Sequence, residues 1–232
     1  MVNFDIISIL FQALAWLAIV LFAYQIYKRQ VLQPRIWKIV VIMIVGLVSF
    51  TINLPVADTT LNISILPLGV WVLFFLRGRR NSWQSYRSFA WLGFFANFIF
   101  LTATLLTIPI HGFIYPKDEG TTYLANIENA SIIQINPLAS EAILDKNKLD
   151  EQLQQMKQKE IHSDKWYEDM YRKVDGEQSE RFPYQLIDGL PLWGSGLQSV
   201  VYVEEDGRGI VISTGKEQLY FRSDKSILKE EE

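Results

Sequence analysis

The sequence predicts a membrane protein in which a four-helix transmembrane bundle is followed by a small α+β extracytoplasmic domain. Four long apolar runs lie in the first half of the 232-residue chain. Residues 1–114 carry eight Lys and Arg against two Asp, a net charge of +6. Residues 115–232 carry fourteen against 23 Asp and Glu, a net charge of −9. One soluble domain rarely segregates charge in this way, so we expect a membrane domain over 1–115 and an aqueous domain over 116–232.

The four runs cover residues 6–27, 39–57, 61–76 and 88–114. A helix needs roughly 20 residues to cross a hydrocarbon core of about 30 Å, and three of the runs reach that length. The third run is shorter and contains Pro67 and Gly69. We expect it to span as a kinked helix, with a re-entrant hairpin shared with the second run as the alternative.

Positive charge in the first half lies in two short loops, one after the first run and one after the third. Its members are Lys28, Arg29, Arg35, Lys38, Arg77, Arg79, Arg80 and Arg87. Cytoplasmic loops carry such an excess, so we expect both loops inside and both termini extracytoplasmic. The cations then determine topology and contact anionic lipid headgroups. The loops are too short to follow a nucleic-acid groove, so we expect no nucleic-acid partner.

Polar residues within the runs are mild. The middle of each run lacks Asp, Glu, Lys, Arg and His, which argues against a proton-coupled transporter. Gln12 and Asn97 either line a small polar pocket or hydrogen-bond across helices, and we favour the packing role. The small residues Gly46, Ala90 and Gly93 indicate close approach of helices.

The second half predicts two helices packed on an antiparallel meander. Residues 121–135 are typical of two short strands. Leu149, Leu153 and Met156 form an apolar stripe on one helix, and a second helix is expected to begin near Ser163. Residues 198–203, 209–213 and 218–222 then predict three strands, with Asp206-Gly207 in the first turn.

Catalytic and metal-binding patterns are weak. The chain has no Cys, which excludes disulfides and thiolate sites, and only two His, His111 and His162. Ser195 lies between glycines but outside a GxSxG pattern. Glu204, Glu205 and Asp206 are adjacent in an acidic turn without the oxygen spacing of a calcium loop, so we expect that turn to be solvated. We expect no catalytic serine, no metal and no cofactor.

An apolar loop at residues 186–197, LIDGLPLWGSGL, is the most distinctive stretch of the second half. If exposed, it would bind a partner or enter lipid, because exposed apolar patches with Trp mark contacts. If buried, it would fill the core. The candidate contact residues are Leu190, Leu192, Trp193 and Leu197.

Two functional hypotheses follow. The first is a non-enzymatic, multi-pass protein of a bacterial cell membrane, whose acidic domain binds another envelope or membrane protein, self-associates, or senses an extracytoplasmic condition. The second is an enzyme or transport subunit acting on a lipid or envelope precursor at the outer membrane face. That alternative site would use His111, Lys117, Asp118 and Glu119, where the fourth run leaves the membrane. The lipid bilayer is a partner in both hypotheses.

Overall fold

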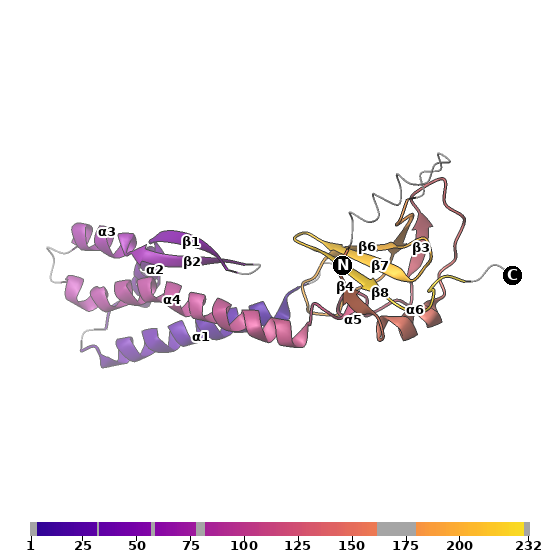
Figure 1. The fold of residues 1–232 in the computed structure, drawn as a ribbon. Helices are drawn as coiled ribbons and strands as arrows, with labels where there is room; N and C mark the ends of the chain where they lie inside the picture. The colour runs from indigo at the N-terminus through magenta and orange to yellow at the C-terminus, as the bar shows by residue number, and fades with distance from the viewer. Residues whose placement is uncertain (1–3, 32, 57–58, 78–81, 162–179, 230–232) are drawn as a thin grey trace. The chain divides into compact units, whose positions relative to one another are not determined.

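The computed structural model describes residues 4–31, 33–56, 59–77, 82–161 and 180–229 (Figure 1). The chain divides into two units. Residues 7–110 form the helical unit, and residues 1–6 together with 111–232 form the carboxy-terminal unit. The first residues of the chain therefore belong to the same unit as its acidic second half.

Helices and one β-hairpin make up the first half of the chain. In chain order the elements are α1 (Ile6–Arg29), α2 (Ile36–Leu47), β1 (Phe50–Val56), β2 (Thr59–Leu66), α3 (Leu68–Arg77) and α4 (Ser82–Ile114). Among the described residues, two helices are long and apolar enough to cross a membrane, namely α1 and the Trp83–Ile114 part of α4. These correspond to the first and fourth expected spans. A bundle of four spanning helices is not seen in the described part of the chain.

A β-hairpin replaces the end of the expected second span and the beginning of the third. β1 and β2 pair antiparallel, with Ile52 opposite Ile63 and Leu54 opposite Leu61. The flanking helices α2 and α3 have only 12 and 10 residues. Their rises of about 18 and 15 Å are shorter than the roughly 30 Å hydrocarbon core. The prediction of continuous helices over 39–57 and 61–76 was therefore wrong.

The local sequence explains the hairpin. Apolar side chains alternate along β1, and the residues between them are Thr, Asn and Pro, which gives the period of two that is typical of a strand. Pro55 would break the interior of a helix. β2 is rich in β-branched residues, which favour strands. The alternating apolar set of β1 is Phe50, Ile52, Leu54 and Val56.

Glycines let the helices of the helical unit approach backbone to backbone. A Cβ on Gly46 would overlap the carbonyl oxygen of Ala90, and one on Gly93 would overlap that of Met43. The predicted close approach at Gly46, Ala90 and Gly93 is therefore confirmed. Gly69 at the start of α3 makes the same kind of contact with the backbone of α2. Such contacts are typical of helices packed in lipid, where small residues form the interfaces.

Asn97 hydrogen-bonds the end of α2. Its Nδ2 donates to the carbonyl oxygens of Leu47 and Phe94, at 3.1 Å each. Beside it, the Ser49 hydroxyl donates to the Ser64 hydroxyl at 2.9 Å, which links the residue before β1 to β2. The amide thus satisfies a helix carbonyl that has no intrahelical partner. This geometry supports the packing role for Asn97.

A six-stranded antiparallel sheet forms the centre of the carboxy-terminal unit (Figure 1). Its strand order is β3-β5-β6-β7-β8-β4, and β6, β7 and β8 are the three strands of the predicted meander. The elements are α5 (Gly120–Tyr123), β3 (Ser131–Gln134), α6 (Lys146–Leu153), β4 (Lys157–Lys159), β5 (Tyr184–Ile187), β6 (Ser199–Val203), β7 (Gly209–Thr214) and β8 (Gln218–Arg222).

The core of this unit lies between α6 and the sheet. Leu149 and Leu153 of α6 are buried with Ile210 and Phe221, which confirms the predicted apolar stripe for these two residues. Met156 is also buried, but it lies after the end of the helix, so the prediction of a helical position was wrong for it. Asp145 caps the helix, because its carboxylate accepts from the backbone N–H groups of residues 147 and 148. The predicted turn is also present, with Gly207 at a φ of +67° that favours glycine.

Other parts of this domain differ from the expectation. The first of the two strands expected within 121–135 is the short helix α5, and only the second, β3, is a strand. β4 and β5 were not predicted, because they have only three and four residues. The helix expected near Ser163 lies outside the described residues.

Candidate functional site

The candidate site is the loop Gly189–Leu197, which we call the juncture loop. It lies in the carboxy-terminal unit together with the first residue of α1 and the last turn of α4. The backbone N–H of Ile6 donates to the Gly194 carbonyl at 3.0 Å. The Tyr115 hydroxyl donates to the Trp193 carbonyl at 3.1 Å. The loop therefore contacts the ends of both long apolar helices.

His111 completes these contacts from the last turn of α4. Its Nε2 lies 2.9 Å from the carbonyl oxygen of Ser195. A carbonyl oxygen only accepts, so Nε2 carries the proton in this bond. Three consecutive carbonyls, those of Trp193, Gly194 and Ser195, thus accept hydrogen bonds from residues at the helix ends.

Two glycines allow the close approach of the chain to this loop. Gly194 and Gly196 have φ values of +80° and +68°, a region that side chains disfavour. A Cβ on Gly194 would lie 2.7 Å from the Ile6 side chain, and one on Gly196 would lie 2.9 Å from Asp5. The sequence WGSG is therefore explained by packing against the amino-terminal residues.

The structure shows the juncture loop to be partly buried and partly exposed. Leu197 packs against the core. Leu190 and Leu192 retain part of their surface, whereas Trp193 is 84% exposed. The two alternatives for the loop thus apply to different residues. The hydrogen bonds and Leu197 hold it to the unit, and Trp193 projects from it.

The residues of the alternative outer-face site have separate contacts. His111 bonds to the juncture loop, while Lys117 forms a 2.9 Å ion pair with Glu217 at the β7–β8 turn. Glu119 accepts from Thr121, and Asp118 is exposed. The structure therefore places these four residues close in sequence without bringing their side chains to one shared point.

Ser195 has the wrong environment for a nucleophile. It is 2% exposed, and the ring of His111 bonds its carbonyl. Its hydroxyl accepts from the backbone N–H of Leu197 at 3.3 Å. A nucleophile needs a base at its hydroxyl and access to substrate. Ser195 is thus explained by the loop's own structure.

Of the topology residues, those whose side chains are described lie at the surface of the helical unit. Lys28, Arg29, Arg35 and Arg87 are exposed, and Lys38 lies over the ring of Trp37. Arg77 ends α3, and Arg79 and Arg80 lie outside the described residues.

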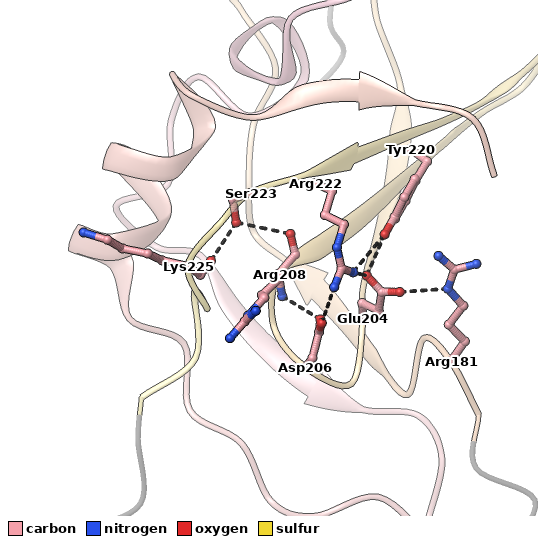
Figure 2. Close-up of polar contacts among 8 residues, drawn as sticks. All are labelled: Arg181, Glu204, Asp206, Arg208, Tyr220, Arg222, Ser223 and Lys225. Carbon is pink, nitrogen blue, oxygen red and sulfur yellow. Dashed lines mark hydrogen bonds and ion pairs between the residues drawn. The ribbon is translucent and has the colours of Figure 1, made fainter. Parts of the chain in front are cut away.

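A cluster around Glu204 is the main polar feature that the sequence did not predict (Figure 2). Glu204 follows β6 and is only 8% exposed. Its carboxylate accepts from Arg181 Nε at 2.8 Å and from the Tyr220 hydroxyl at 2.7 Å. It also pairs with Arg222, which bonds Asp206 at 2.6 Å through its other terminal nitrogen. The expectation of a solvated acidic turn was therefore wrong for Glu204.

Electrostatics in this Glu204 cluster follow from its partial burial. Burial, with a hydrogen bond to the Glu204 carboxylate, raises the pKa of Tyr220. Burial lowers the pKa of Arg222, but hydrogen bonds to Tyr220 and Asp206 and the charge of Glu204 outweigh it, so the pKa is raised. Arg181 behaves similarly, and its guanidinium lies 5.1 Å from the centre of the Tyr220 ring. The raised pKa of each arginine means that both stay charged beside the Glu204 carboxylate.

The Glu204 cluster joins elements that are distant in the sequence. Arg181 precedes β5, Glu204 follows β6, and Tyr220 and Arg222 lie on β8. Its carboxylates are occupied by arginines, which supports a structural role. The described residues contain no group of three or more His, Cys, Asp or Glu placed to hold a metal ion. Sequence spacing offered no signal for the cluster, because its members meet only in the folded sheet.

Comparison of the chain with protein-family models, with characterised proteins and with solved structures found no match.

Proposed function

We propose that the chain is a non-enzymatic membrane protein whose carboxy-terminal unit lies outside the cytoplasm and binds another membrane or envelope protein. α1 and α4 anchor it in the cell membrane. The segment between them enters the bilayer from the basic side and returns to that side. Both termini are then extracytoplasmic, as the positive charge of the loops favours.

The helix ends support this topology. Ile6 begins α1 and His111 lies in the last turn of α4, and both bond to adjacent carbonyls of the juncture loop. The proposed membrane placement then requires an even number of crossings between them, because two residues bonded to one loop lie on the same side. This parity holds whether or not the β1–β2 hairpin passes through the bilayer, so it does not depend on four full spans.

Exposed apolar side chains at the β3 edge of the sheet carry the binding proposal. Within the described part of the chain β3 pairs only with β5, so its other edge offers N–H and C=O groups to a further strand. Ile133 and Ile135 are almost half exposed, and Leu138 is 77% exposed. An extended segment of a partner can add to such an edge through main-chain bonds, with apolar contacts giving specificity.

The polar chemistry of the unit favours binding over catalysis. His111 donates to a carbonyl, Glu204 is held by two arginines, and Ser195 is buried. A general base or nucleophile must reach a substrate, and these groups are already engaged within the fold.

The lack of native Cys permits a direct test of topology in intact cells. Leu138 is exposed in the carboxy-terminal unit, and Gln84 is exposed near the start of α4. We expect Leu138→Cys to react with a membrane-impermeant maleimide and Gln84→Cys to react only after permeabilisation. The reverse pattern would place the carboxy-terminal unit in the cytoplasm. Ser195 is unsuitable as a label site because it is buried.

Binding is tested by a photoreactive group attached at Leu138→Cys. Gly215→Cys is the matched control, since position 215 is exposed and a Cβ there meets nothing within 4 Å. We expect one discrete adduct from position 138, lost when Ile133→Lys is added, and none from position 215. Equal adducts from both positions, or none from position 138, would contradict the β3-edge surface.

A further inference from the structure

We infer that the juncture loop is a lipid-interface anchor, with Trp193 and Phe113 inserted into the outer leaflet at the level of the headgroups and upper acyl chains. The inference rests on the proposed membrane function, and it assigns this loop to lipid. The two side chains belong to the same unit, because α4 ends and the loop lies within it.

Exposure is the first argument. Trp193 is 84% exposed and Phe113 is 89% exposed, and Phe4 and Ile114 also retain about half of their surface or more. Several large apolar side chains exposed within one small region indicate a contact surface. Trp in particular favours the membrane–water interface, where its ring is in contact with lipid and its N–H with headgroups.

Position is the second argument, and it selects lipid over a protein partner. Phe113 lies in the last turn of an apolar helix of spanning length, and Phe4 lies two residues before the start of another. The ends of spanning helices lie at the headgroup level. The loop bonds to Ile6 and His111, so Trp193 is presented beside those helix ends rather than at the far side of the domain.

Backbone satisfaction is the third argument. A loop that enters lipid must leave no unpaired carbonyl there, because each such group costs several kcal/mol in hydrocarbon. The carbonyls of Trp193, Gly194 and Ser195 each accept a hydrogen bond from Tyr115, Ile6 and His111 respectively. The tip of the loop therefore presents an apolar side chain with its neighbouring carbonyls already satisfied.

The test uses the full chain in vesicles of phosphatidylcholine and phosphatidylglycerol. Trp193→Cys carries an environment-sensitive fluorophore, and Leu138→Cys is the matched control at a similarly exposed site. We expect a blue-shifted emission at position 193, with quenching by a nitroxide on the upper acyl chain several-fold stronger than at position 138. Aqueous iodide should quench position 138 several-fold more strongly than position 193. Phe113→Cys should behave as Trp193→Cys does.

Two outcomes would overturn the inference. Equal iodide quenching at positions 193 and 138 would leave the loop in water. Protection of position 193 from both quenchers would show that protein, from a partner or a second copy, covers it. Either result leaves the topology test with Gln84→Cys unaffected, so failure of the lipid anchor is distinguishable from failure of the proposed membrane function. Each labelled variant should elute from size-exclusion chromatography at the same volume as the unmodified chain, which verifies its fold.

Discussion

Each of the two units of this protein is stabilised internally by a different kind of interaction. In the helical unit, glycines bring backbones into contact and the Asn97 amide bonds the end of α2. In the carboxy-terminal unit, an apolar core and the Glu204 cluster join the strands of a sheet. This difference in stabilising interactions is the one expected for a helical unit in lipid and a carboxy-terminal unit in water. Lipid offers no hydrophobic drive between helices, whereas water drives burial of apolar side chains.

The largest effect is expected where a glycine contacts backbone. A Cβ at Gly69 would overlap a carbonyl of α2, so Gly69→Ala must separate α2 from α3. We expect a loss of at least about 3 kcal/mol, at or beyond the upper end of typical overpacking costs. The melting temperature of the detergent-solubilised protein measures this loss. After heating, size-exclusion chromatography gives the fraction of protein that remains folded.

Gly112→Ala is the matched control for this prediction, because a Cβ at Gly112 meets nothing within 4 Å. Alanine has the higher helix propensity, so this variant should be as stable as the wild type or slightly more stable. Equal stability of Gly69→Ala and Gly112→Ala would show that close backbone approach is not what holds the helical unit.

In the carboxy-terminal unit, the next largest effect is expected at Glu204. Glu204→Ala leaves Arg181 and Arg222 without their shared carboxylate. We expect a loss of about 2–3 kcal/mol, less than for fully buried pairs, because both arginines keep some contact with water. Pulse proteolysis of the full chain in urea measures it, and the exposed Asp224→Ala should change stability by less than about 0.5 kcal/mol. A similar loss in both variants would show that the cluster is not specifically stabilising.

A smaller effect is expected at the amide of the helical unit. Asn97→Ala removes the donor to the Leu47 carbonyl, which leaves the end of α2 unsatisfied. Hydrogen bonds between helices in lipid contribute about 1 kcal/mol, so we expect a loss of that order in the same melting experiment. Thr102 bonds only within its own helix among the contacts described, so Thr102→Ala should cost less. An unchanged melting temperature for Asn97→Ala would contradict the packing role of Asn97 and favour its role in a polar pocket.

The smallest effect is a dependence on alkaline pH. The folded pKa of Tyr220 is raised by burial and by Glu204. Its contribution to stability is therefore complete below about pH 10, the ordinary pKa of tyrosine, and is lost as pH rises through the folded value. Tyr220→Phe should be less stable than wild type at neutral pH, and the difference should narrow above about pH 10. Pulse proteolysis from neutral to alkaline pH measures the stability of both proteins. A difference between wild type and Tyr220→Phe that stays constant over this range would contradict the raised pKa of Tyr220.

Much of the carboxy-terminal fold was predictable because its signals are local. The apolar stripe of α6, the β-branched and aromatic runs of β6 to β8 and the Asp206-Gly207 turn are each contained in a few consecutive residues. The hairpin in the helical unit was equally local, since Phe50, Ile52 and Leu54 alternate with polar residues. It was not predicted because the length and hydropathy of the run indicate a membrane helix, whereas only its period of two indicates a strand.

The polar sites were not predictable for a physical reason. Glu204 meets Arg181 and Arg222 only after strands distant in sequence pair, and no spacing rule connects them. The juncture loop was recognised as distinctive from its Trp and glycines. Its partners at Ile6 and His111 could not be inferred, because a loop's contacts depend on where the sheet places it.

The pairing of Ile6 with Gly194 has a consequence for how the protein is made. Ile6 is synthesised long before Gly194, whose carbonyl its backbone N–H bonds. This hydrogen bond can therefore form only after residue 194 has been translated, when both long helices already exist. A chain truncated before residue 194 would lack this closure even with both long helices in place.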